Sequence, residues 1–200
     1  MLWHAPWVAI PGRTAALCGI LGPVAFVGGW LVNGLRTDGY DPVVQAISQL
    51  AREGAPTRLS MSVCFVAFGV LVPVWAPTVA RRVGAPALRP AVTVAGLATV
   101  AVAALPLTRE PGGTQDLLHA LAAGTGYVAM ALTPLLAVRA LRRAGRTRAA
   151  ALSGLTGVVS AAALVATVVS DSSGLFQRLG LGVVDLWHVV VAGWVLTRRG

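Results

Sequence analysis

Six long apolar runs, separated by short polar connections, occupy most of this 200-residue chain. The runs cover residues 14–35, 59–80, 90–107, 116–138, 149–170 and 179–196. A helix needs about 20 predominantly apolar residues to cross the hydrocarbon core of a bilayer, and the runs are close to that length. The sequence therefore predicts an all-α fold, a polytopic membrane bundle of six transmembrane helices that forms one domain over residues 1–200.

The composition excludes the other broad classes of protein. Hydrophobic residues make up 56% of the chain and charged residues only 12%, whereas a soluble domain carries about 25% charged residues. So few charges cannot cover the surface of a soluble globule, and the same numbers exclude intrinsic disorder. No nucleic-acid partner is expected, because the basic residues lie between the apolar runs, where they indicate membrane topology.

The basic residues predict the orientation in the membrane. All sixteen are Arg, and the formal net charge is +9. The N-terminus, the second and fourth connections and the C-terminus carry eleven of them, against five on the other side. An excess of Arg marks the cytoplasmic side, so both termini are expected inside. The absence of Lys beside abundant Arg, Ala, Val and Gly is typical of a GC-rich bacterium, which favours the bacterial cytoplasmic membrane as the location.

The acidic residues lie on the opposite side from this excess of Arg. Five of the seven fall in the predicted outer connections, and Asp116 and Asp185 fall in the outward halves of the fourth and sixth spans. Any polar site is therefore expected to open toward the outer face of the membrane.

The first outer connection has the pattern of a short amphipathic helix. Asp41 and Pro42 form a favourable helix start, and apolar residues then recur at helical spacing as far as Leu50. Gly54 can end the helix. Such a segment is expected to lie on the outer interface of the membrane. It is either a simple connector between two spans or a lid over a cavity.

Two Asp-x-x-His elements place ionisable groups inside the spans. Asp116 and His119 open the fourth span, and Asp185 and His188 lie in the sixth. Residues at i and i+3 share a helix face, and ionisable groups in a span usually mark function or a buried partner. Both spans run from outside to inside, so the two pairs are expected to face one polar cavity. These four residues are the catalytic candidates.

Most of these polar residues also have a structural explanation. Asp116 lies in the first turn of its helix, where an acid favours the helix dipole and Thr114 could be the N-cap. His119 could be a histidine at the membrane interface, whereas no cap explains Asp185. Arg178, just before the sixth span, either neutralises an acid, binds a phosphate or carboxylate, or extends to the interface.

Several short motifs together resemble a known family. Ile47-Ser48-Gln49-Leu50 follows the Asp41-Pro42 turn, His119 comes early in the fourth span, and Gly174-Leu175-Phe176-Gln177-Arg178 precedes a Trp-bearing last span. This set resembles the bacterial membrane family called domain of unknown function 998, over nearly the whole chain. The resemblance implies six spans and no assured activity.

One connection departs from the family pattern. The family has a Phe-Pro and an Asp before its fourth span, whereas this chain has Leu105-Pro106 followed by Thr108-Arg109-Glu110. Either Glu110 or Asp116 therefore takes the family's acidic position.

The polar residues favour a membrane enzyme that acts by acid–base chemistry on an isoprenoid or lipid-like substrate. An Asp in an apolar cavity can stay protonated and act as a general acid, which is what a class II-type, protonation-initiated terpene cyclase requires. Asp185 would be the proton donor, with His188 or Asp116 as its tuning partner. The remaining candidates would bind the substrate or stabilise a cation: Trp187, Phe176, Gln177, Arg178, Tyr40, Gln49, Glu53 and Trp30.

Two other classes of function stay open. Asp and His residues in spans also serve transporters and proton relays, and polar residues can simply join helices in a structural or sensory subunit. A zinc-dependent lipid hydrolase is less favoured, because no His-rich or His-Glu-x-x-His spacing is present. We therefore expect no metal and no cofactor, and as partners a hydrophobic small molecule or lipid and the bilayer itself.

Overall fold

The structure, a computed structural model, describes residues 12–197 and contains helices but no strands in that range. The helices are α1 (Gly12–Leu35), α2 (Arg58–Val83), α3 (Leu88–Ala104), α4 (Thr114–Arg143), α5 (Thr147–Val169) and α6 (Ser173–Thr197), with a short 3₁₀-helix, η1 (Ile47–Ala51), before α2. All of the α-helices except α3 are long and apolar enough to cross a membrane. The predicted all-α class is thus confirmed for the described residues, with one helix shorter than the others.

Two helix boundaries differ from the predicted spans for identifiable reasons. α3 ends at Ala104 rather than near residue 107, because Leu105 precedes Pro106 and a residue before proline disfavours the helical conformation. α6 begins at Ser173 rather than near residue 179. The polar Gln177 and Arg178 suggested a connection there, but both lie inside the helix and use their side chains in hydrogen bonds.

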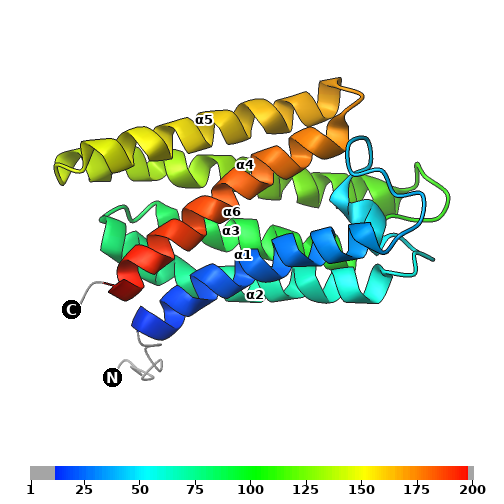
Figure 1. The fold of residues 1–200 in the computed structure, drawn as a ribbon, viewed down its shortest axis with the longest axis horizontal. Helices are drawn as coiled ribbons and strands as arrows, with labels where there is room; N and C mark the ends of the chain where they lie inside the picture. The colour runs from blue at the N-terminus through cyan, green and yellow to red at the C-terminus, as the bar shows by residue number, and fades with distance from the viewer. Residues whose placement is uncertain (1–11, 198–200) are drawn as a thin grey trace, which may run out of the picture.

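The helices form a closed bundle (Figure 1). Each packs against the next along the chain, and α6 returns to lie against α1. The close packing of α2 on α3 depends on two glycines that face each other. A Cβ atom at Gly69 would lie 2.8 Å from the carbonyl oxygen of Gly96, and one at Gly96 would lie 3.0 Å from that of Gly69. Small residues at such crossings let membrane helices approach closely.

The first connection is built differently from the predicted amphipathic helix. Turns occupy residues 42–44, and only Ile47–Ala51 forms a helix, of the tighter 3₁₀ type. Ile47, Leu50 and Ala51 are buried against the bundle. The segment therefore covers one end of the helices through its apolar side chains.

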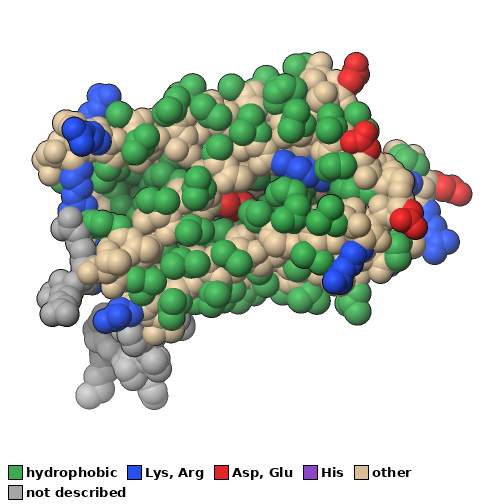
Figure 2. Space-filling model, in the orientation of Figure 1, with side chains coloured by type: hydrophobic (Ala, Val, Ile, Leu, Met, Phe, Trp, Pro, Cys, Tyr) green, Lys and Arg blue, Asp and Glu red, His purple; other side chains and the backbone are tan. Residues whose placement is uncertain are grey.

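The two ends of the molecule differ in charge (Figure 2). Basic side chains gather at one end, where Arg81 and Arg82 end α2 and Arg142 and Arg143 end α4. We call this the arginine end, and the opposite end, covered by η1, the η1 end. Arg198 and Arg199, which also entered the predicted orientation, lie outside the described residues.

Candidate functional site

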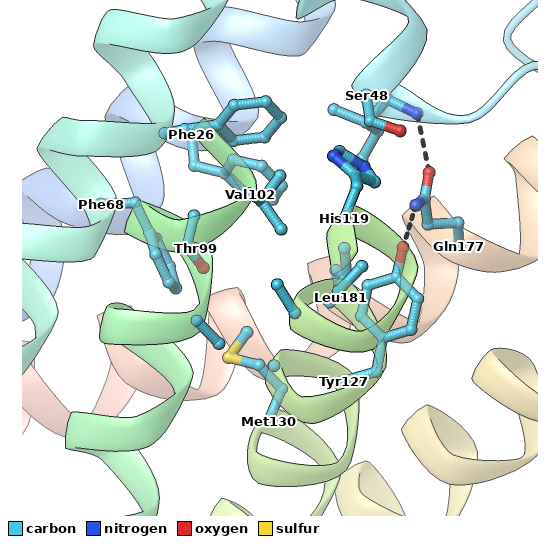
Figure 3. A pocket seen from close by; sticks show the side chains of 16 residues that line it. Phe26, Ser48, Phe68, Thr99, Val102, His119, Tyr127, Met130, Gln177 and Leu181 are labelled. Atoms are coloured by element: carbon cyan, nitrogen blue, oxygen red, sulfur yellow. Dashed lines mark hydrogen bonds between the residues drawn. The ribbon is translucent and has the colours of Figure 1, made fainter. Parts of the chain in front are cut away.

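A cavity lies inside the bundle directly beneath η1, and we call it the η1 cavity (Figure 3). The volume that the centre of a water-sized molecule can occupy in it is about 50 Å³. This is room for a few waters or one small chemical group. Side chains from α1, η1, α2, α3, α4 and α6 line it: Phe26, Ile47, Ser48, Phe65, Phe68, Ala98, Thr99, Val102, His119, Ala122, Ala123, Gly126, Tyr127, Met130, Gln177 and Leu181.

The hollow results from one face of α4. His119, Ala123, Gly126 and Met130 follow each other at spacings of three or four residues, so they share one helix face. Ala123 and Gly126 are too small to fill the space opposite Phe26, Phe65 and Phe68, and the cavity remains between them. An apolar cavity with a few converging polar groups is the usual form of a small-molecule site.

Gln177 connects the roof of the cavity to its wall. The backbone N–H of Ile47 donates to Oε1 of Gln177 over 2.7 Å, and Nε2 of Gln177 donates to the hydroxyl of Tyr127 (Figure 3). Because a backbone N–H can only donate, this pairing fixes which way the amide points. The Tyr127 hydroxyl accepts from Gln177, so that bond does not use its own proton.

His119 is the ionisable group best suited to acid–base chemistry among the residues that line the cavity. Its Nδ1 atom lies 2.6 Å from the carbonyl oxygen of Leu105. A carbonyl only accepts, so Nδ1 carries a hydrogen and Nε2 is the basic nitrogen of the neutral ring. Figure 3 shows the ring beside Ser48, at the η1 side of the cavity.

The segment Gly174–Arg178 clamps the first connection onto the bundle. Arg178 donates to the carbonyl oxygens of Pro42 and Gln45 at 2.7 and 3.0 Å and to the hydroxyl of Tyr40, and its guanidinium lies 5.2 Å from the centre of the Trp30 ring. A Cβ atom at Gly174 would lie only 2.4 Å from the Gln45 carbonyl oxygen, so this close approach requires glycine. Burial raises the pKa of the Tyr40 phenol, and the charge of Arg178 opposes that rise.

The family assignment follows from a direct comparison. The family model described as "Protein of unknown function (DUF998)" matches residues 20–194, which include part or all of every helix. The chain belongs to this family. No curated protein and no solved structure matches it. In this DUF998 chain, the motifs that carried the resemblance lie at the clamp, at η1 and at His119. Ile47, Ser48, His119 and Gln177 from these motifs line the η1 cavity.

The two residues of the first Asp-x-x-His element, Asp116 and His119, have different roles in the DUF998 chain. Asp116 accepts from the backbone N–H groups of Thr108 and Gly112, both at 2.8 Å, and from the Thr108 hydroxyl at 2.9 Å. It therefore holds the connection before α4, whereas Glu110 is exposed. Only His119 of this pair lines the η1 cavity.

The second Asp-x-x-His element lies away from the η1 cavity. Asp185 and His188 are buried on α6, and neither the carboxyl oxygens nor the imidazole nitrogens have a hydrogen-bond partner among the described residues. Asp185 lines a different hollow, between α1 and α6. His188 packs against the edge of Trp187, whose Nε1 donates to Ser153 of α5 over 2.9 Å.

Of the eight expected substrate-binding residues, Gln177 alone lines the η1 cavity. Tyr40 and Trp30 belong to the clamp with Arg178. Glu53 accepts from Gln115 over 3.3 Å and its backbone N–H bonds to Leu107, so it joins two connections. Gln49 and Phe176 are half-buried outside the lining.

Sequence reasoning missed most of the cavity's wall. Tyr127, Thr99 and the three phenylalanines line it but belong to no motif, and Ser48 belongs to the Ile47–Leu50 motif but was not a site candidate. The usable signal was the row of small residues that follows His119 on the same face of α4, because small residues beneath a polar group leave a space. Among residues 12–197, no three His, Cys, Asp or Glu side chains come together as a group that could hold a metal ion.

Proposed function

We propose that this protein is an integral-membrane enzyme that takes the end of a hydrophobic, isoprenoid- or lipid-like molecule into the η1 cavity. The observation that carries the proposal is an apolar, aromatic cavity lined by one imidazole, His119, and by the hydrogen-bonded pair Tyr127 and Gln177. His119 acts as the acid–base residue, because its Nδ1 bonds to the Leu105 carbonyl and leaves Nε2 to accept or donate the proton.

The other lining residues have complementary roles in this proposal. Phe26, Phe65 and Phe68 hold the apolar part of the substrate. Tyr127 and Gln177 orient its polar atom. The cavity admits a small group only, so η1 serves as the lid that moves to admit a larger substrate end, and the bond from Ile47 to Gln177 keeps it closed.

A protonation-initiated terpene cyclase is the more specific form of the proposal, and the geometry supports it less well. Its proton donor would be Asp185, but that carboxyl lines the hollow between α1 and α6, whereas the described residues around the η1 cavity include no Asp or Glu. His119, in contrast, already lines the η1 cavity, so acid–base chemistry by this residue does not require Asp185 to move into it.

The orientation belongs to the same proposal. We place the arginine end in the cytoplasm, with both termini inside and the η1 cavity opening outward, because Arg is concentrated on the cytoplasmic side of membrane proteins. The bacterial cytoplasmic membrane is the proposed location.

The test is turnover of a panel of prenylated and lipid substrates in membranes that contain wild type, His119→Gln or His188→Gln. We expect product from wild type and from His188→Gln, which lies outside the cavity, and loss of product from His119→Gln. Thermal unfolding in detergent shows whether each variant is folded. Product that is unchanged in a folded His119→Gln variant would refute the role of His119.

The second candidate function is that of a structural or sensory subunit. The hydrogen bonds that hold the connections in place favour this function. Arg178, Gln177 and Asp116 all use their polar atoms to hold connections in place. One set of results would replace the first function with this second one: no substrate of the panel is turned over, none raises the unfolding temperature of wild type, and His119→Gln has a lower unfolding temperature than wild type. The polar residues would then serve to stabilise the fold.

A further inference from the structure

A second hollow opens sideways between α1 and α6, and we call it the α1–α6 groove. Pro23, Val27 and Gly28 of α1 and Gly182, Asp185 and Val189 of α6 line it. Val24 and Leu186, which also belong to it, are 55% and 62% exposed. Because the outer surfaces of spans face lipid, this groove opens to the hydrocarbon of the bilayer. Figure 2 shows a small acidic area in a hollow between apolar side chains, with basic side-chain atoms on the same face nearer the η1 end.

Asp185 is the acidic residue of this groove, and its carboxyl has no partner. The side chain is 2% exposed, and neither oxygen makes a hydrogen bond with any described residue. It lies midway along α6, which is far from water at either end of the span. None of the residues that line the groove is basic. A buried carboxyl without a hydrogen bond is costly, so the site is completed by something that bonds to it.

The groove also has unfilled space beside this carboxyl. A Cβ atom added at Gly28 or at Gly182 would meet no atom within 4 Å. The glycines at the crossings of α2 with α3 and of α5 with α6 behave differently, because a Cβ there would collide with the neighbouring helix. The two groove glycines therefore keep a space open instead of allowing two helices to touch.

We propose that the α1–α6 groove is a binding site, separate from the η1 cavity, for a hydrophobic molecule dissolved in the membrane that carries a hydroxyl group. The hydroxyl bonds to Asp185, and the hydrocarbon part lies along the groove between Val27 and Val189. A hydroxyl fits because it can accept from a protonated carboxyl and donate to its second oxygen. The apolar remainder of the groove offers nothing to a second polar group.

The test uses the full chain in lipid vesicles and the hydrophobic reagent dicyclohexylcarbodiimide, with hexadecanol and hexadecane as probes. A protonated carboxyl adds across the carbodiimide: its proton moves to one nitrogen, its oxygen bonds to the central carbon, and the acyl group then shifts to nitrogen without any group leaving. Peptide mass spectrometry locates the adduct. We expect modification at Asp185, slowed several-fold by hexadecanol and unaffected by hexadecane.

Two glycine variants make the test specific to the groove. Gly28→Leu adds a side chain where a Cβ meets no atom within 4 Å, so we expect it to occupy the groove and to protect Asp185 from the reagent when no alcohol is present. Gly124→Leu is the matched control, because a Cβ there also meets nothing within 4 Å but points into a different surface hollow, on α4. It should leave the labelling unchanged. Asp185→Asn should abolish the adduct on that peptide.

Three results would overturn the proposal. Asp185 that reacts only after denaturation would show that the groove is closed to lipid-soluble molecules. Equal protection by hexadecane and hexadecanol would show that the groove takes any hydrocarbon and does not recognise a hydroxyl. Protection by hexadecylamine that far exceeds protection by hexadecanol would assign the carboxyl to a cation. The readout is labelling and not turnover, so failure of the enzyme proposal leaves this result unaffected.

Discussion

The amide of Gln177 joins three elements inside the bundle. It belongs to α6, accepts from Ile47 of η1 and donates to Tyr127 of α4. The residue is 4% exposed, so bulk solvent does not compete for these bonds in the folded protein. A buried donor left without a partner costs about 1–3 kcal/mol. The Gln177 side chain thus holds η1 in place over the cavity and also fixes the hydrogen bonding of the Tyr127 hydroxyl in the cavity wall.

Replacing this amide by an apolar side chain should destabilise the protein. We expect Gln177→Leu to lower the free energy of unfolding by about 2 kcal/mol, because the Ile47 N–H and the Tyr127 hydroxyl both lose their partner. Denaturant unfolding in mixed micelles measures the change. Thr125→Val is the control, since the Thr125 hydroxyl bonds only to Leu121 of its own helix. An equal effect from both variants would contradict the joining role of Gln177.

The hydrogen bonds of Arg178 predict how freely the first connection moves. Its guanidinium reaches two carbonyl oxygens of the first connection and the Tyr40 hydroxyl together, a geometry that the single ammonium group of Lys cannot reproduce. We expect Arg178→Lys to speed amide hydrogen exchange in residues 41–47 several-fold while the charge is kept. The exposed Arg58, replaced by Lys in the same way, should leave those amides unchanged. Unaltered exchange in Arg178→Lys would refute the clamp.

At the scale of elements, α4 contributes the most to the site. Its inner face presents His119 and Tyr127 with small residues between them, while its outer face carries Ala120, Leu121 and Gly124 toward a different hollow. The cavity therefore exists because α4 has small side chains opposite the aromatic rings of α1 and α2.

Filling that space should remove ligand binding without unfolding the bundle. We expect Ala123→Leu to abolish the rise in unfolding temperature caused by any substrate that wild type binds, because the added atoms occupy the cavity. Ala120→Leu, on the outer face of the same helix, should leave that rise intact. The stability of Ala123→Leu without ligand should change little if the cavity accepts the side chain. Binding that survives in Ala123→Leu would exclude the η1 cavity as the site.

The helices could be predicted from the sequence because long apolar runs of this length have few other folds available. The motif residues could also be recognised, but their roles could not. Gln177 and Arg178 appeared to be ligand-binding groups in a connection, yet they lie in a helix and bond to the chain itself. Tyr127 gave no signal, because its importance depends on a bond to Gln177, fifty residues away. Contacts between helices are not encoded in the periodicity of either one.

At the scale of the whole molecule, the bundle is polarised from end to end. Arg side chains collect where α2 ends and α5 begins, and acidic side chains lie toward η1 (Figure 2). The ring of helices is closed by α6 against α1, so the α1–α6 groove lies where the last span meets the first.

The charge asymmetry predicts which end faces the cytoplasm. In a background without Cys18 and Cys64, we expect a membrane-impermeant maleimide to label Asp171→Cys, at the η1 end, in intact cells. Ala144→Cys, at the arginine end, should react only after the cells are opened. Both positions are exposed, so folding itself does not shield either one. The reverse pattern would invert the proposed orientation.

The short α3 has a consequence for the surrounding lipid. Its 17 residues extend about 25 Å along the helix axis, whereas the hydrocarbon core of a typical bilayer is about 30 Å thick. α3 is held against α2 and α4, so it cannot shift on its own to relieve the difference. A helix shorter than the bilayer core is accommodated by thinning of the bilayer or by its flanking residues, and we expect thinning on that one side of the protein. Lipids with shorter or kinked chains should therefore gather beside α3, so that the bilayer around the protein would differ from one side to the other.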